Sequence, residues 1–175
     1  MKDRTCAGRA IRPLRRDRMA QPVLPTILLV EDTPSDATLI RRSFEKVNVL
    51  NPIVWVKNGQ EALGYLSGLG QYGDRNKYPL PALILLDLDL PEMSGFELLQ
   101  WKRMQPHIRR IPVVILTIDS AASAVNAAYD LGANSYLIKP GNPEEIMRVV
   151  KIIQEYWLGL NQAPKLVMRA TPDGS

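Results

Sequence analysis

The chain has 175 residues, an ordinary hydrophobic fraction of 46% and a formal net charge of +4. No apolar run approaches the roughly 18 residues that a membrane-spanning helix needs, and no apolar segment of secretory-signal length follows the basic N-terminus. The single cysteine, Cys6, excludes an internal disulfide and a cysteine-based metal site, so we expect one cytoplasmic domain without membrane association.

Most of the positive charge lies in the first eighteen residues. They hold seven basic and two acidic side chains, a net +5, whereas the other residues hold fifteen basic and sixteen acidic side chains, a net −1. Residues 1–23 also lack apolar periodicity, which predicts a disordered basic arm. No aromatic residues lie between its arginines for base stacking, so we favour an unstructured extension over a nucleic-acid contact. We expect residues 161–175 to form a flexible tail.

Strand and helix patterns alternate five times between these ends. Short runs rich in aliphatic residues predict strands at 26–30, 53–56, 83–86, 111–117 and 135–138. Segments with apolar residues on one face predict helices at 34–47, 59–67, 95–104, 120–131 and 143–158. Residues 68–81 mix glycine, proline and charge, which predicts a surface loop. The alternation is typical of one α/β domain over residues 24–160, with a doubly wound, five-stranded parallel sheet and right-handed crossovers.

The central strand leads into a carboxylate. Four large aliphatic residues, Leu83–Leu86, run directly into Asp87. An unbroken apolar run of this kind predicts a strand that is covered on both faces. Ligands bind at the carboxyl ends of such strands, so Asp87 is a candidate functional residue. The alternative is a loop aspartate that caps the next helix.

Other polar residues stand at the ends of neighbouring strands. Glu31 and Asp32 follow the first strand, Thr117 ends the fourth, and Lys139 follows the fifth. Because the carboxyl ends of parallel strands share one edge of the sheet, these side chains should meet Asp87 there. Converging carboxylates repel one another unless a cation lies between them, and Mg²⁺ prefers such oxygen ligands. A lysine and a hydroxyl beside them suit phosphoryl transfer, with Asp87 as the nucleophile.

Four segments of this chain resemble the receiver domain of two-component response regulators. They are Leu29–Asp32, Leu85–Gly95, Leu116–Thr117 and Lys139–Pro140, in the family's order and at its distances. The resemblance covers roughly residues 24–160. It implies a flavodoxin-like three-layer α/β/α fold with strand order 2-1-3-4-5. It also implies a signalling protein, not an enzyme, that takes a phosphoryl group from a sensor histidine kinase.

The resemblance implies a role for each acidic residue of the motif. Asp87 is the expected phosphoacceptor. Asp32 is the expected direct Mg²⁺ ligand, together with Asp87, and Glu31 is expected to act through a water molecule. The backbone carbonyl of Asp89 is expected to complete the metal site.

The remaining matched residues are expected to respond to phosphorylation. Thr117 resembles the switch hydroxyl that moves toward the phosphoryl group, and Lys139 resembles the cation that pairs with that group. Tyr136 stands at the aromatic switch position, whose side chain turns inward in the active state. The resemblance also implies a cis peptide bond between Lys139 and Pro140.

Within the family, the chain is most similar to small single-domain regulators that are paired with bacterial phytochrome kinases. The long loop before the third strand supports this subgroup, and too few residues follow Leu160 for a DNA-binding output domain. Members associate through the fourth helix, the fifth strand and the fifth helix. The last helix carries more apolar residues than one core-facing stripe needs, so we expect a homodimer through that face, with ordinary core packing as the alternative.

Three positions should affect how fast this chain is phosphorylated or dephosphorylated. Ile118 replaces the small residue that generally follows the switch hydroxyl, and we expect it to narrow the access of small phosphodonors. Asp89 and Asp119 flank the path of the hydrolytic water, and their effect on dephosphorylation is open.

Two other functions compete with this interpretation. Asp87 and Asp89 also match the nucleophile and acid/base pair of haloacid-dehalogenase-like phosphatases. That family places the pair after its first strand, however, and would leave Glu31 and Asp32 unexplained. The other alternative is a receiver-like interaction module that is not phosphorylated, against which the intact acids, Thr117 and Lys139 argue.

Overall fold

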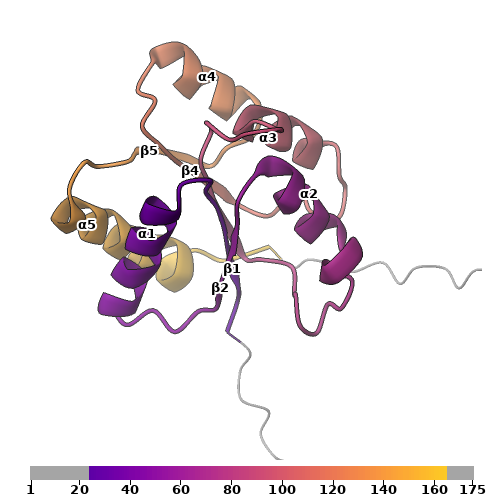
Figure 1. Ribbon diagram of the computed structural model, residues 1–175, viewed down its shortest axis with the longest axis horizontal. Coiled ribbons are helices and arrows are strands. Elements are labelled where there is room, and N and C mark those ends of the chain that lie inside the picture. The colour runs from indigo at the N-terminus through magenta and orange to yellow at the C-terminus, as the bar shows by residue number, and fades with distance from the viewer. Residues whose placement is uncertain (1–23, 165–175) are drawn as a thin grey trace, which may run out of the picture.

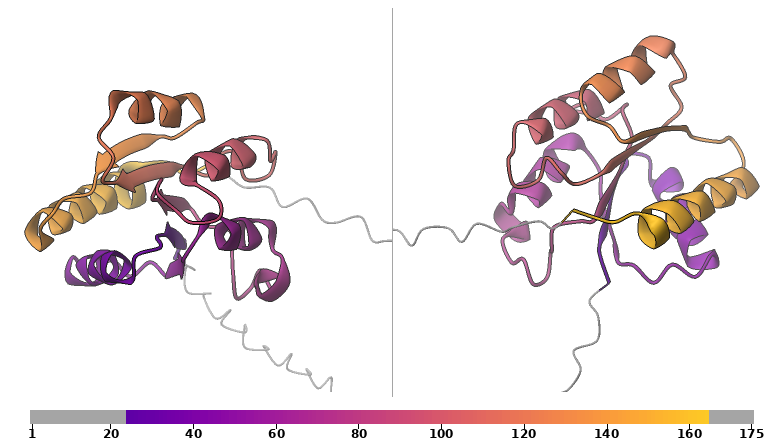
Figure 2. Two further views of the ribbon diagram at one scale, coloured as in Figure 1. Left: turned by 45° about the horizontal axis from the view of Figure 1, so that its top comes forward. Right: turned by 180° about the vertical axis from the view of Figure 1, so that it is seen from behind.

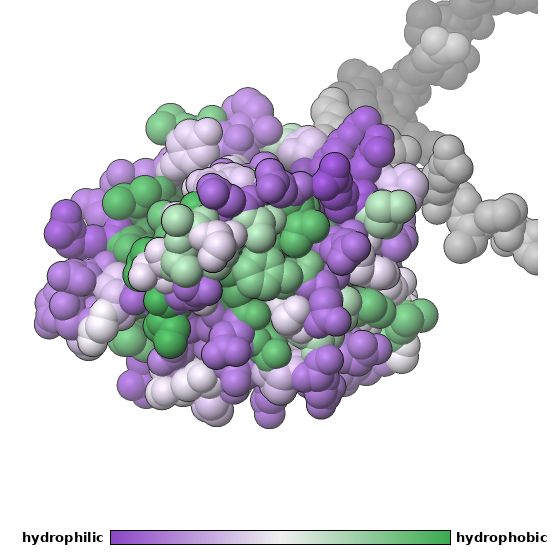
Figure 3. Space-filling view, turned by 90° about the horizontal axis from the view of Figure 1, so that it is seen from above, coloured by the Kyte–Doolittle hydropathy of each residue, from purple (hydrophilic) through white to green (hydrophobic). Residues whose placement is uncertain are grey.

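The computed structural model describes residues 24–164 as a three-layer α/β/α arrangement, with helices on both faces of one central sheet (Figure 1). The basic arm expected at residues 1–23 lies outside the described residues, and so does most of the tail expected at 161–175. Within residues 24–164, no helix is long and apolar enough to cross a membrane. Figure 3 shows one face on which hydrophobic residues lie in separate groups among hydrophilic ones.

The sheet has the expected five parallel strands in the order β2-β1-β3-β4-β5. The strands are β1 (Ile27–Val30), β2 (Ile53–Val56), β3 (Leu83–Leu86), β4 (Val113–Thr117) and β5 (Ser135–Ile138). β1 and β3 are neighbours, with Val30 paired to Leu86 at their carboxyl ends. The residues that directly follow these two strands therefore lie side by side.

Five α-helices cover the sheet, two on one face and three on the other (Figures 1 and 2). The helices are α1 (Pro34–Lys46), α2 (Gly59–Ser67), α3 (Gly95–Arg103), α4 (Ala122–Asp130) and α5 (Pro143–Ile153). α1 packs beside α5 over one face, and α2, α3 and α4 cover the other. Beyond Ile153, where the α-helix was expected to continue, the chain forms the wider turns of a π-helix, η2 (Gln154–Leu160).

The strands are buried on both faces because alternate residues enter two separate cores. In β1, Leu28 and Val30 join the core under α2 and α3, whereas Ile27 and Leu29 join the core under α1 and α5. Both sets must be apolar in a strand that is covered on two sides. This two-sided burial explains the unbroken aliphatic runs in the sequence.

The segment predicted as a plain surface loop contains ordered structure. A short 3₁₀-helix, η1 (Gly70–Tyr72), follows α2, and Tyr65, Tyr72 and Tyr78 pack edge to face with ring centroids 5.0–6.2 Å apart. The prediction missed this cluster because three aromatic residues at irregular spacing produce neither helical nor strand periodicity. Edge-to-face contacts and burial of the rings hold the segment against α2.

Candidate functional site

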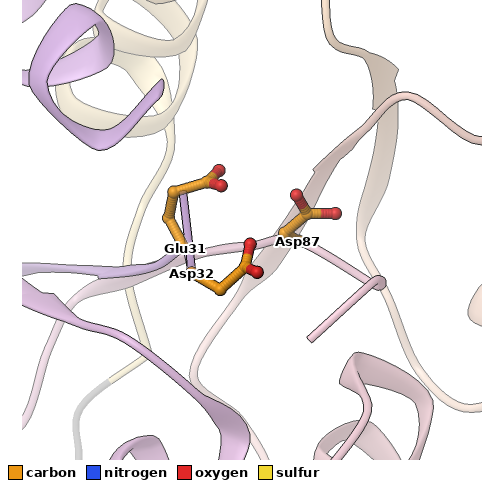
Figure 4. Close-up of side chains that lie close together, drawn as sticks. All are labelled: Glu31, Asp32 and Asp87. Atoms are coloured by element: carbon orange, nitrogen blue, oxygen red, sulfur yellow. The ribbon is translucent and has the colours of Figure 1, made fainter. Parts of the chain in front are cut away.

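Three carboxylates meet at the carboxyl edge of the sheet. Glu31 and Asp32 follow β1 and Asp87 follows β3, and one oxygen atom from each lies within 4.8 Å of the others (Figure 4). Glu31 and Asp87 are buried, at 1% and 6% exposure, whereas Asp32 is exposed. Three oxygen donors at this spacing, one of them open to solvent, fit a hard divalent cation that keeps some of its water.

Lys139 brings a positive charge to two of these three carboxylates. Its ammonium nitrogen lies 2.6 Å from Asp87 Oδ2, 2.8 Å from Glu31 Oε2 and 3.1 Å from Asp36 Oδ2. The lysine side chain is only 6% exposed, so these bonds form largely out of water. Burial opposes the charged form, but hydrogen bonds and charges of Asp87 and Glu31 outweigh it and raise the pKa of Lys139. The ammonium therefore stays protonated at neutral pH.

Burial and the neighbouring Lys139 have opposite effects on the pKa of Glu31. Burial raises the pKa of this carboxyl, and Lys139 offsets only part of that effect. Its two oxygens have separate partners, since Oε1 accepts from the backbone amide of Thr33 at 3.2 Å and Oε2 accepts from Lys139. The backbone carbonyl of Glu31 accepts from the indole nitrogen of Trp55 at 2.7 Å. These contacts fix Glu31 at the inner side of the cluster.

Asp36 lies outside the group of three carboxylates but is a partner of Lys139 that the sequence did not reveal. It lies in the first turn of α1, and its side chain is 36% exposed. The sequence contained a signal: an acid in the first turn of a helix that begins at the functional edge of the sheet. Only the packing of α1, however, brings this turn to Lys139, which is 103 residues away in sequence.

Thr117 and Tyr136 lie next to the cluster on β4 and β5. Thr117 is fully buried, and its carbonyl oxygen accepts from the Lys139 amide at 2.7 Å, which joins the two strand ends. The Tyr136 hydroxyl donates to the backbone carbonyl of Asp119 at 2.9 Å. Burial, and then the negative charges of Asp119 and Asp87, raise the pKa of Tyr136. Both residues are thus brought to the edge where the acids meet.

The prediction of a cis bond between Lys139 and Pro140 was wrong. No cis peptide bond occurs within residues 24–164. The trans form of an X–Pro bond is intrinsically favoured by about 0.5–1 kcal/mol, and with this bond trans the Lys139 side chain already reaches Glu31 and Asp87.

The loop after β3 is fixed close to Asp87 by a glycine. Gly95, the first residue of α3, packs so tightly that an added Cβ would collide with the carbonyl oxygen of Asp87. Its amide donates to the Leu88 carbonyl at 3.0 Å. The Asp89 amide donates to Asp87 Oδ1 at 3.3 Å, and Asp89 itself is exposed at the site entrance. Ile118 is 70% exposed, so its side chain projects from the end of β4 toward solvent.

Comparisons with known proteins show which family of sequences this chain resembles. Residues 27–151 match the sequence model of the response regulator receiver domain. The probable methanogenesis regulatory protein FilR2 of Methanothrix harundinacea is 44% identical over 138 residues, which cover 79% of this chain and 86% of FilR2. Response regulator Rcp1 of Synechocystis sp. is 36% identical over 132 residues, which cover 75% of this chain and 88% of Rcp1.

Solved structures give the same result. The crystal structure of the Mn²⁺-bound form of Rcp1 matches with a TM-score of 0.73 and 34% identity, over 81% of this chain and 99% of that one. The phosphorylated cyanobacterial phytochrome response regulator RcpA matches with a TM-score of 0.76 and 36% identity, over the same shares of the two chains.

Proposed function

This chain belongs to the response regulator receiver domain family, and from that premise we propose that it accepts a phosphoryl group from a sensor histidine kinase on Asp87. The observation that carries the proposal is the position of Asp87, whose carboxylate lies within 4.8 Å of two other acids and 2.6 Å from the Lys139 ammonium. Asp87 is 6% exposed, and its carboxylate lies at the carboxyl edge of the sheet. It can act as a nucleophile while positive charge lies ready for the incoming phosphoryl oxygens.

The proposed step is a transfer from a phosphohistidine. An Asp87 carboxylate oxygen forms the new bond to phosphorus, and the bond between phosphorus and the donor imidazole nitrogen breaks. The electron pair of that bond leaves with the imidazole, and the product is an acyl phosphate on Asp87. In this proposal Lys139 pairs with an oxygen of the transferred group, and the Thr117 hydroxyl then moves toward it.

We propose Mg²⁺ as the cation for the acidic cluster. Asp32, Asp87 and the Asp89 carbonyl would bind it directly and Glu31 through water, and the ion would neutralise charge on the phosphoryl oxygens. The fit of three carboxylate oxygens within 4.8 Å supports a divalent ion, and the related Rcp1 has been crystallised with Mn²⁺.

The proposed response to phosphorylation involves Thr117 and Tyr136. A phosphoryl group adds roughly two negative charges beside Lys139. A Thr117 hydroxyl drawn toward that charge would leave space for Tyr136, which would change the surface made by α4, β5 and α5. We propose this surface also as the homodimer face, because it carries the exposed side chains of Tyr129, Ile138 and Ile152.

A phytochrome-type kinase is the proposed phosphodonor, because RcpA is a phytochrome response regulator of the same fold. We propose residues 24–160 as the receiver unit. The phosphatase alternative loses its basis, because the Asp87–Asp89 pair follows the third strand of a receiver-type sheet rather than a first strand.

Intact-mass measurement tests the proposed function. The wild-type chain, incubated with acetyl phosphate and Mg²⁺, should gain the mass of one phosphoryl group, and Asp87→Asn should not. Asp130→Asn, which removes an exposed acid from α4, is the matched control and should label like the wild type. A phosphoryl adduct that persists in Asp87→Asn would remove the assignment.

A further inference from the structure

Lys139 has one acidic partner that does not belong to the metal-binding group. The ammonium has three N–H groups, and three carboxylates of the described chain lie within 3.1 Å of it. Two of them, Glu31 and Asp87, also belong to the group whose oxygens can share a cation, whereas Asp36 lies outside that group. Lys139 and a cation therefore compete for Glu31 and Asp87 but not for Asp36.

We propose that Asp36 is a positioning residue that holds the Lys139 ammonium when Glu31 and Asp87 turn to a cation and to the phosphoryl group. The inference rests on the proposed function and adds a residue to its site.

The contacts of Asp87 explain why Lys139 needs a further partner. Asp87 Oδ2 accepts from Lys139, and Oδ1 accepts from the Asp89 amide at 3.3 Å, so both oxygens of the nucleophile have partners. To pair with a phosphoryl oxygen, the ammonium must weaken its bond to Asp87. The Asp36 carboxylate stands on the more open side of the site, at 36% exposure, and stays available during that change.

Without the Asp36 carboxylate, Lys139 should therefore bind more firmly to Glu31 and Asp87. These two carboxylates would then be less available to Mg²⁺. A partly exposed ion pair is worth up to about 1 kcal/mol, or about fivefold in an equilibrium constant. We expect Asp36→Asn to weaken Mg²⁺ binding by about three- to fivefold.

A loss of affinity alone would not establish this role, because any lost negative charge weakens the binding of a cation. A double-mutant cycle separates the two effects. If Asp36 acts through Lys139, Asp36→Asn should change the Mg²⁺ dissociation constant by less than about twofold in a Lys139→Gln background. Lys139→Met gives a second background if the glutamine variant does not fold, as judged by circular dichroism.

The measurement is a Mg²⁺ titration followed by tryptophan fluorescence. Trp55, one of three tryptophans, donates to the Glu31 carbonyl at 2.7 Å, so its share of the emission should respond to changes at Glu31. Asp119→Asn is the matched control, because Asp119 is an exposed acid at the same edge whose side chain accepts from the Ala121 amide. Its effect should be equal in both backgrounds. Thermal unfolding without Mg²⁺ shows whether any variant has lost its fold.

The outcomes are distinct. A fold-change for Asp36→Asn that is at least about twice as large with Lys139 present as without it supports the role. Any smaller ratio, including equal fold-changes in the two backgrounds, overturns it and leaves the proposed function intact. A wild-type chain that binds no Mg²⁺ would instead overturn the metal site of the proposed function.

Discussion

The Tyr136 hydroxyl on β5 donates a hydrogen bond to the backbone carbonyl of Asp119, 2.9 Å away in the loop between β4 and α4. This bond ties the last strand to the loop that follows Thr117. A side chain on one strand thereby restrains the backbone next to the proposed phosphorylation site. A change at Thr117 and a change at Tyr136 are thus mechanically linked.

We expect Tyr136→Phe to loosen that loop without unfolding the domain, because a partly exposed hydrogen bond contributes only about 0.5–1.5 kcal/mol. Hydrogen exchange of a peptide that covers residues 118–124 should become faster. Tyr129→Phe, at an exposed tyrosine of α4, is the control and should leave that exchange unchanged. Identical protection in Tyr136→Phe and the wild type would show that the bond restrains nothing.

Ile118 should limit the access of small phosphodonors to Asp87. Because its side chain is 70% exposed, Ile118→Ala should leave the melting temperature nearly unchanged, so that a kinetic effect can be interpreted. We expect faster labelling by acetyl phosphate in Ile118→Ala, followed as the rate at which the phosphorylated mass appears. Labelling of the wild type at the same rate would count against a gating role.

Lys102 should make stability depend on pH in the alkaline range. This α3 lysine is 4% exposed, and its ammonium donates to the Arg109 carbonyl at 3.0 Å. Burial lowers the pKa of Lys102 to about 8, below its ordinary value of 10.5. Between these values the unfolded chain binds more protons than the folded chain, so the free energy of unfolding rises with pH.

The full cost of burying this charge is therefore present below about pH 8 and is relieved above it. Relative to Lys102→Met, the wild type should gain about 2 kcal/mol in the free energy of unfolding between pH 7 and pH 10. Urea denaturation at both pH values measures the gain. Relative to Lys151→Met, at a lysine with 66% side-chain exposure, the wild type should show no comparable gain. A pH-independent difference for Lys102→Met would refute the depressed pKa.

Arg75 should hold the segment between α2 and β3 in its ordered form. Its guanidinium donates to the backbone carbonyls of Tyr65 and Leu66 at 2.8 Å and of Tyr78 at 3.2 Å. We expect Arg75→Ala to lower the free energy of unfolding by about 2–3 kcal/mol, because hydrogen bonds from a charged donor are lost. Arg75→Lys should not restore it, since a single ammonium cannot reproduce the planar fork.

Thermal unfolding of both variants tests this role, with Arg42→Ala on the exposed side of α1 as the control. Equal melting temperatures for Arg75→Ala and Arg42→Ala would show that the segment needs no such clamp.

Much of this molecule is determined by local patterns. Strands that are buried on both faces must be apolar at every position, so β1, β3 and β4 are visible as aliphatic runs in the sequence. Glu31, Asp87 and Lys139 directly follow strands, and parallel strands bring their carboxyl ends to one edge. The expected meeting of these side chains therefore required only the order of the strands, which the resemblance to the family supplied.

Contacts between distant segments were decided only by the tertiary structure. Asp36 reaches Lys139 because α1 packs beside α5 and places its first turn over the end of β5, a relation that no local spacing encodes. The tyrosine cluster and the Arg75 contacts likewise depend on how the chain returns across α2. Periodicity records which side of an element is buried, because burial repeats with the element's own geometry. It does not record which partner a polar side chain finds, because that depends on where another element has been placed.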